Sequence, residues 1–245
     1  MFEYTMVDKN LENKVILVTG AGAGIGKEAA ITYAKLGATV ILLGKTVSKL
    51  EAVYDEIIGL GLAEPAIIPL DLKGATKQNY LDMAATITSQ FGHLDGALLN
   101  ASILGELTPF TQIHEQIFTD VMKVNVSAQL LLAQALIPTL QLASNASLVF
   151  TSSGVGNQGR AYWGAYSISK FATEGMMQLI ADEYENSNLR TNAINPGATN
   201  TGMRNSAYPA EDKDKLASPS DIMPLYVYLM SDDSLDINGQ TLKAQ

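Results

Sequence analysis

Short apolar runs rich in β-branched residues alternate along the chain with longer segments whose apolar positions recur at helical spacing. The first run, NKVILVTG at 13–20, predicts a strand that is buried on both faces. The next segment, GIGKEAAITYAKLGA at 24–38, predicts a helix, with Gly37 where a helix would stop. We expect further strands at 39–44, 66–72, 94–102, 146–153, 189–197 and 239–244, and further helices at 48–60, 77–92, 112–142, 165–186 and 219–231.

This alternation predicts βαβ units, and therefore an α/β fold with a doubly wound, mostly parallel sheet of about seven strands and helices on both faces. We expect Ser48 to cap the helix that begins there. No repeat, low-complexity segment or linker divides the chain, so we expect a single domain over residues 1–245. Open sheets of this kind bind ligands outside the carboxyl ends of the strands. The residues at those ends are therefore the first candidates for a functional site.

Composition narrows the possible functions. The chain has 245 residues, of which 47% are hydrophobic and 17% charged, and its formal net charge is −9. A chain this acidic is not expected to bind nucleic acid or an anionic membrane. It has no cysteine and only two histidines, His93 and His114, so we expect no disulfide and no metal site. No apolar stretch approaches the ~20 residues of a membrane span, and the polar N-terminus predicts a cytoplasmic location.

A glycine-rich loop, TGAGAGIG at 19–26, joins the first strand to the first helix. Gly20, Gly24 and Gly26 have the spacing G-x-x-x-G-x-G, which departs from the common dinucleotide fingerprint G-x-G-x-x-G because residue 25 is Ile25. Glycine still permits a tight turn, and the helix N-terminus still offers N–H groups to a pyrophosphate. The alternative is an ordinary glycine-rich connection. The position between a strand and a helix favours the phosphate-binding loop.

The end of the second strand bears on the choice of cofactor. An acidic residue there would accept a hydrogen bond from the adenosine ribose and repel a 2′-phosphate. The chain has Gly44 and Lys45 instead, and a lysine can pair with that phosphate. We therefore expect NADP(H) rather than NAD(H); a solvent-exposed loop lysine is the alternative. Asp71, at the end of the third strand, could accept from an adenine amino group or could cap a turn.

Two tyrosines, Tyr162 and Tyr166, precede Lys170 at intervals of four residues. In a helix all three share one face. Hydride transfer to a carbonyl leaves charge on the oxygen, so an acid must supply a proton there. Tyrosine has a pKa of about 10, and a neighbouring lysine ammonium lowers it. Only Tyr166 has a cation at i+4, which favours it over Tyr162 as the acid/base. An exposed pair would show the same spacing.

Taken together, these residues resemble the short-chain dehydrogenase/reductase family over nearly the whole chain. The segments SKFATEGMMQ, ADEY and DIMPLY are most similar to the bacterial YciK-type oxidoreductases. This resemblance implies no particular substrate. Each motif is weak alone, but the set in this order is specific and implies a Rossmann-type fold. The matches are T-G-x-x-x-G-x-G at 19–26, the adenine-side Asp71, N-A at Asn100 and Ala101, a mid-helix Asn125, T-S-S at 151–153, Y-x-x-x-K at 166–170 and P-G-x-x-x-T at 196–201.

The resemblance implies a role for each matched residue. Tyr166 would be the acid/base, and Ser153, thirteen residues before it as in the family, would hold the substrate oxygen. Asn125 would hold a water that connects Lys170 to solvent, and Lys170 would also bind the nicotinamide ribose. The expected cofactor contacts are Gly20, Gly24, Ile25, Gly26, Lys45, Asp71, Leu72, Asn100, Ala101, Tyr166, Lys170, Pro196, Gly197, Thr199 and Thr201.

The chain departs from the family where N-N-A-G is replaced by residues 99–102, LNAS. Leu99 removes a side-chain hydrogen bond at the strand end, and Ser102 adds a side chain near the cofactor path. The aromatic pair Tyr162 and Trp163 either lines the substrate site or packs. Residues 202–219 are expected to form a mobile lid over the substrate.

The sequence therefore predicts an NADP(H)-dependent oxidoreductase that acts on a small carbonyl or secondary alcohol. Two alternatives stay open: an NAD-preferring dehydrogenase, and a non-catalytic nucleotide sensor, which typically lacks the tyrosine and lysine found here. The long helices at 112–142 and 165–186 would pair with copies of themselves in a homodimer or homotetramer.

Overall fold

A seven-stranded sheet forms the centre of the protein in this computed structural model, which describes residues 1–245. The strand order is β3-β2-β1-β4-β5-β6-β7, and all neighbouring strands are parallel rather than mostly so. The doubly wound α/β fold is thus confirmed. The strands are β1 (Val15–Thr19), β2 (Thr39–Gly44), β3 (Ala66–Pro69), β4 (Gly96–Leu99), β5 (Ala146–Thr151), β6 (Leu189–Asn195) and β7 (Thr241–Lys243).

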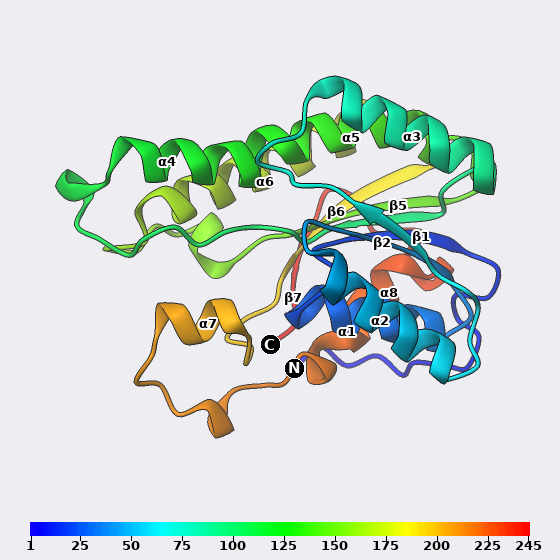
Figure 1. Ribbon diagram of the computed structural model, residues 1–245, viewed down its shortest axis with the longest axis horizontal. Coiled ribbons are helices and arrows are strands. Elements are labelled where there is room, and N and C mark those ends of the chain that lie inside the picture. Colours follow the sequence, from blue (N-terminus) through cyan, green and yellow to red (C-terminus); the bar gives the residue numbers. More distant parts are fainter.

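Helices cover the sheet on both faces (Figure 1). The helices α3 (Lys77–Phe91), α4 (Glu115–Met122), α5 (Ala128–Leu140) and α6 (Gly164–Glu183) form the upper layer in Figure 1. The lower layer consists of α1 (Gly24–Lys35), α2 (Val47–Gly59) and α8 (Met223–Met230). The short α7 (Gly202–Ala207) and the segment that follows it, drawn in orange, project beside the sheet.

Each face of the sheet has its own hydrophobic core. One cluster of 28 buried residues lies under α3, α5 and α6, and another of 27 lies under α1, α2 and α8. The strands β1, β4 and β5 are buried along their whole length. A strand that is apolar on both faces needs a partner layer on each side, which is why these runs show no polar alternation.

The long helix after β4 is more complex than expected. It begins at Glu115 instead of residue 112, which ends a short 3₁₀ turn (Phe110–Gln112). A π-helical turn, Lys123–Ser127, interrupts it between α4 and α5. Such turns hold one extra residue and occur often at functional sites. Ser48 is also not the cap of α2: that helix begins at Val47 after Thr46, and no side chain caps it.

One helical stretch, Glu115–Leu140, is long and apolar enough to cross a membrane by length and composition alone. Of its most apolar window, 56% is buried inside the protein, and α5 packs against α3 and β4. Core helices of globular proteins pass the same test. The stretch is therefore weak evidence for a membrane span.

Candidate functional site

Two cavities lie side by side along the carboxyl edge of the sheet. One has a volume of about 350 Å³ and the other about 480 Å³. They form one groove, because Gly20, Ala23, Ala101 and Ser102 line both. The groove lies where β1 has β2 on one side and β4 on the other, which is the crevice expected for a doubly wound sheet. We call the cavity nearer β4 and β5 the catalytic cavity and the other the adenosine cavity, after the roles that the sequence predicts for their lining residues.

Most of the predicted site residues line this groove. Only Gly26, Asn125 and Lys170 do not line it. The catalytic cavity brings together Gly20, Gly24, Ile25, Asn100, Ala101, Ser153, Tyr166, Pro196, Gly197, Thr199 and Thr201. The adenosine cavity brings together Gly20, Lys45, Asp71, Leu72 and Ala101.

The glycine loop has the geometry of an anion cradle. Gly20 has φ +68°, a conformation that side chains other than glycine rarely adopt. A Cβ on Gly26 would lie 2.3 Å from the Gly20 carbonyl oxygen, so only glycine fits where α1 meets the loop. No side chain caps the N-terminus of α1, whose first N–H groups are therefore free, and Gly24 and Ile25 of its first turn line the groove. Loop and helix end together suit a pyrophosphate.

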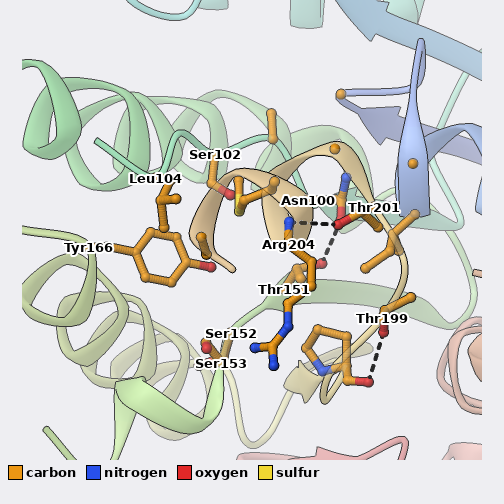
Figure 2. Close-up of a pocket in the computed structure, with 18 of the residues that line it drawn as sticks. Asn100, Ser102, Leu104, Thr151, Ser152, Ser153, Tyr166, Thr199, Thr201 and Arg204 are labelled. Carbon is orange, nitrogen blue, oxygen red and sulfur yellow. Dashed lines mark hydrogen bonds between the residues drawn. The ribbon is translucent and has the colours of Figure 1, made fainter. Parts of the chain in front are cut away.

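Three polar side chains tie the ends of β1, β4 and β5 together under the groove. The Asn100 and Ala101 N–H groups donate to Thr19 Oγ1 over 2.9 and 3.0 Å. The Thr151 hydroxyl donates to Asn100 Oδ1 over 3.1 Å (Figure 2). Leu99, where the family has an asparagine, is buried in the core. Ser102 lines both cavities, and its place near the cofactor path stays a prediction.

The amino-terminal half of α6 carries the tyrosines and the lysine. Tyr166 is 7% exposed and faces the catalytic cavity, whereas Tyr162 is 62% exposed and lies outside it. Tyr162 also has φ +74°, so it belongs to a strained turn before the helix and does not share the helix face. Trp163 lines the cavity, and its ring centroid lies 5.7 Å from that of Tyr166. Of the aromatic pair Tyr162 and Trp163, therefore, only Trp163 lines the cavity.

Lys170 is fully buried behind Tyr166. Its Nζ lies 5.5 Å from the centre of the Tyr166 ring and donates to the Thr151 carbonyl over 2.7 Å. Burial lowers the pKa of Lys170 to about 8, and Glu174, one turn further along α6, opposes that effect. The ammonium is thus held in a low-dielectric site with a proton that it can release near neutral pH.

The expected lowering of the Tyr166 pKa by Lys170 is wrong for this structure. Burial raises the pKa of Tyr166 to about 12, and the neighbouring Ser153 hydroxyl only partly offsets this. The physical reason is that removal from water destabilises the phenolate, while the Lys170 ammonium is bonded to a carbonyl of β5. Tyr166 therefore keeps its proton at neutral pH.

Asn125 lies in the π-helical turn and is fully buried. Its Oδ1 accepts from the Ile103 N–H over 2.8 Å, and its Nδ2 donates to the Ile103 carbonyl over 2.9 Å and to Ser169 Oγ over 3.0 Å. It therefore joins the loop after β4 to α6, one residue before Lys170. The predicted link from Asn125 to Lys170 through a water stays a prediction.

The two serines at the end of β5 point to different surroundings. Ser153 lines the catalytic cavity and its Oγ accepts from the Val155 N–H. Ser152 is 1% exposed and donates to the buried carboxylate of Glu174. The other carboxylate oxygen of Glu174 accepts from Thr241 of β7. Of the two hydroxyls, the Ser153 hydroxyl is thus the one that remains available to a ligand.

The loop after β6 closes the other side of the catalytic cavity. Gly197 has φ +72°, and Gln245 packs against it and donates to the Pro196 carbonyl over 2.6 Å. Thr199 is buried and donates to the same carbonyl over 3.2 Å. Thr201 caps α7 by accepting from the Arg204 N–H over 3.2 Å.

The adenosine cavity is lined by several exposed polar groups. The side chains of Lys45 and Lys49 are exposed and have no hydrogen bond or ion pair within the chain. Lys73 lines the same cavity but pairs with Asp120 over 2.7 Å. Asp71 Oδ1 accepts from the Lys73 N–H over 3.1 Å, so it does form the turn that was one of its two predicted uses. It also lines the cavity, and its contact with adenine stays a prediction.

A scan against protein-family models identifies residues 14–212 as a short chain dehydrogenase domain. The chain belongs to the short-chain dehydrogenase family. This confirms the resemblance and makes the protein an oxidoreductase by family. The glycine loop, the groove and the Ser153–Tyr166–Lys170 constellation all lie within the matched residues.

Several short-chain dehydrogenases similar to this chain are bacterial. It is 53% identical over 235 residues to "Uncharacterized oxidoreductase YciK" of Escherichia coli K12, a match that covers 96% of this chain and 93% of that protein. A short-chain dehydrogenase of Escherichia coli CFT073 crystallised with NADPH is 52% identical, has a TM-score of 0.95 and covers 98% of this chain and 100% of its own. One of Shigella flexneri 2a crystallised with NADP has the same identity and TM-score, with coverage of 97% and 100%.

Sequence reasoning did not single out some residues that this short-chain dehydrogenase brings to the groove or directly behind its lining. Lys49 could have been found, because it lies one turn after Lys45 at the start of α2. Glu174 could have been found by the same i+4 argument that selected Tyr166, because it follows Lys170 by four residues on α6. Arg204 lies in the predicted lid and lines the catalytic cavity, and no local pattern marked it.

Proposed function

We propose that this oxidoreductase is NADP(H)-dependent and exchanges hydride with a carbonyl or secondary alcohol, using Ser153, Tyr166, Lys170 and Asn125. The observation that carries the proposal is the arrangement at one end of the groove. The Ser153 and Tyr166 side chains line the cavity, and Lys170 lies buried directly behind the tyrosine. A site of this kind can hold a carbonyl oxygen and exchange a proton with it.

The groove fits a dinucleotide. Gly20 and Gly26 let the loop fold tightly against the residues after β4 where a side chain would clash, and the uncapped α1 end suits the pyrophosphate. Thr199, Thr201 and the backbone of Pro196 and Gly197 would hold the nicotinamide half. The adenosine half would contact Asp71, Leu72, Asn100 and Ala101. The bound nicotinamide supplies or accepts the hydride.

Lys45 supports NADP(H) over NAD(H). It is exposed at the end of β2, lines the adenosine cavity, and has no acidic neighbour in the lining except Asp71. A 2′-phosphate would therefore meet a cation without a competing partner. The relatives from Escherichia coli CFT073 and Shigella flexneri crystallised with NADPH and NADP support the same choice. The NAD-preferring alternative predicts that Lys45→Ala leaves the NADPH Kd unchanged.

The residues divide the proton chemistry between them. Tyr166 keeps its proton at neutral pH, which is the form that donates to a carbonyl oxygen. Ser153 would donate a hydrogen bond to the same oxygen and stabilise its developing charge. Lys170, with its pKa near 8, would return a proton to the site. Asn125 would hold the water between Lys170 and solvent. Together these roles favour reduction of a carbonyl at neutral pH.

The test is a panel of small aldehydes and ketones, assayed by NADPH oxidation with the wild type and with Tyr166→Phe. We expect turnover by the wild type and a loss of about 10²- to 10⁴-fold in the variant, with the NADPH Kd within about twofold. If the wild type binds NADPH but turns over no carbonyl or alcohol on the panel, the non-catalytic sensor becomes the better proposal.

Three further proposals concern the setting of this site. Residues 1–245 act as one domain, with residues 202–219 as a lid that moves over the substrate. The chain assembles as a homodimer or homotetramer through α4, α5 and α6, where Leu130, Phe171 and Leu179 are exposed apolar side chains. The expected compartment is the cytoplasm. Light scattering of the wild type and Leu179→Glu checks the assembly, and a monomeric wild type contradicts it.

A further inference from the structure

The catalytic cavity has a marked asymmetry of charge. Of its 21 lining residues, Arg204 is the only one with a charged side chain. The protein as a whole has a formal net charge of −9, so a cavity with one cation and no anion runs against the composition of the chain. A cavity whose lining holds one cation and no anion favours a ligand with an acidic group.

Arg204 is held in place before any ligand arrives. Its Nε donates to Glu211 Oε2 over 2.6 Å and its Nη2 donates to Glu211 Oε1 over 2.5 Å. Its guanidinium carbon lies 4.2 Å from the centre of the Tyr208 ring. Tyr208 contacts Trp163, which contacts Tyr166, so a row of aromatic rings connects the arginine to the proposed acid/base. The fixed side chain loses little freedom on binding.

Glu211 occupies only one edge of the guanidinium. A guanidinium carries five N–H groups, and the pair uses the edge formed by Nε and Nη2. The Nη1 atom has no hydrogen bond within the chain, so the edge formed by Nη1 and Nη2 remains open to a second carboxylate. Glu211 itself does not line the cavity. The side chain of Arg204 is 23% exposed, which leaves it accessible from the groove.

The rest of the cavity near Tyr166 is mainly apolar, with Leu104, Trp163, Met203 and Ala207 in its lining. Figure 2 shows Arg204 drawn among the same lining side chains as Tyr166, Ser152 and Ser153. A ligand with an apolar body, a carbonyl at Tyr166 and a planar anion at Arg204 matches these three surfaces. A carboxylate is the planar group that a guanidinium edge binds with two parallel hydrogen bonds.

We propose that the substrate of this site is a keto acid, or the corresponding hydroxy acid, whose carboxylate binds the open edge of Arg204. Glu211 is a positioning residue that holds the arginine in this orientation. This proposal rests on the proposed function, because it names the substrate class of the same site. The competing use of Arg204, contact with the cofactor pyrophosphate, is an outcome that the test separates.

The test compares three straight-chain oxopentanoic acids, with the keto group at the second, third or fourth carbon, and their methyl esters. We expect the wild type to prefer at least one acid over its ester by about 10-fold or more in kcat/KM. Arg204→Met should lower kcat/KM for that acid by about 100-fold, change the ester by less than about threefold and leave the NADPH Kd unchanged. Arg204→Lys keeps the charge without the planar edge, so its kcat/KM for the acid should lie between those of the wild type and Arg204→Met.

Lys215→Met is the matched control, because Lys215 is another cation of the lid, is 81% exposed and does not line the cavity. It should leave the preference for the acid unchanged. The proposal is overturned if the wild type uses the esters as well as the acids. It is also overturned if Arg204→Met weakens NADPH binding and slows acid and ester equally, because Arg204 would then serve the cofactor.

A binding measurement separates this proposal from the proposed function. Pentanoate is titrated by calorimetry into the NADP⁺-loaded wild type, Arg204→Met and Lys215→Met proteins. Binding to the wild type and the Lys215 variant, with at least about 10-fold weaker binding to the Arg204 variant, supports the carboxylate site even if no carbonyl is turned over. Equal binding to all three proteins, or binding to none, overturns it even if neutral ketones are reduced.

Discussion

The two ends of the groove both carry lysines, and the surroundings of those lysines differ in almost every respect. In the adenosine cavity the side chains of Lys45 and Lys49 are exposed and have no hydrogen-bond or ion-pair partner within the chain. At the catalytic end Lys170 is fully buried, bonds to a carbonyl of β5 and lies one turn from a buried carboxylate. An exposed lysine supplies a charge that solvent and salt weaken. A buried lysine supplies a proton whose pKa the protein sets. The comparison predicts a large, pH-dependent effect at one end and a small, salt-dependent one at the other.

The largest effect is expected from removing the buried lysine. Lys170→Met should lower kcat by about 10²- to 10⁴-fold, because it removes both the proton source and the proposed ribose contact. Steady-state kinetics with any carbonyl that the wild type reduces provides the measurement. An exposed lysine of the same protein, Lys215, gives the control variant Lys215→Met. Retention of more than a tenth of the wild-type kcat would contradict the role of Lys170.

Burial of Lys170 also predicts how stability depends on pH. Its pKa is about 8 in the folded protein and 10.5 without burial, so the unfolded chain binds more protons between these values. The free energy of unfolding should therefore rise between pH 8 and pH 10, by about 2 kcal/mol from this residue. Below pH 8 Lys170 is protonated in both the folded and the unfolded protein, so its contribution to the free energy of unfolding does not change with pH. Denaturant titrations of the wild type and Lys170→Met isolate the effect, and parallel pH curves would contradict it.

A smaller effect is expected from Glu174, the only charged group that raises the pKa of Lys170. Glu174→Gln keeps acceptor capacity for Ser152 or Thr241 but removes the charge. Lys170 should then lose its proton at lower pH, so the alkaline limb of the kcat/KM profile should move down by about half to one pH unit. Glu183→Gln, on the same helix but exposed, is the matched control. A profile that falls in height without moving along the pH axis would mean that Glu174 acts only on structure.

The smallest effect is expected at the exposed lysines. Lys45→Ala should raise the NADPH Kd by about 5- to 10-fold and leave the NADH Kd unchanged, since only NADPH carries the 2′-phosphate. Lys49→Ala should have a weaker effect of the same sign. Fluorescence titrations at about 0.05 and 0.5 M salt should show the wild-type advantage shrink as screening increases. An unchanged NADPH Kd in both variants would favour the NAD-preferring alternative.

How much the sequence could predict depended on how local each signal was. The glycine loop, the buried strands and the Tyr166–Lys170 pair are contained in segments of one or two turns, and their positions in the fold follow from the order of the elements. The Ser48 cap was wrong because capping depends on where the helix begins, and α2 begins one residue earlier. The pKa of Tyr166 was wrong in direction because spacing shows a neighbour but does not show burial.

The features that were missed depend on distant contacts. Glu174 meets Thr241, 67 residues away, and Arg204 is held by the Glu211 fork and the Tyr208 ring. Neither the spacing of apolar residues nor a family motif predicts such contacts between distant side chains. The π-helical turn at Lys123–Ser127 is likewise invisible in the apolar pattern, because it adds one residue to a helix that otherwise continues.

The extra residue in the π-helical turn around Asn125 sets how α4 is rotated relative to α5. One residue corresponds to a rotation of about 100° around a helix axis. Deleting one position from Lys123–Ser127 would restore a regular α-helix and turn α4 by that angle against α5, carrying the α4 surface away from α6. A change of one residue in the length of this turn would therefore disturb both the hydrogen bonds between Asn125 and Ile103 and the packing of α4 against α6. In this protein, the number of residues in one helical turn therefore sets the rotation of α4 relative to α5, and with it the contact between α4 and α6.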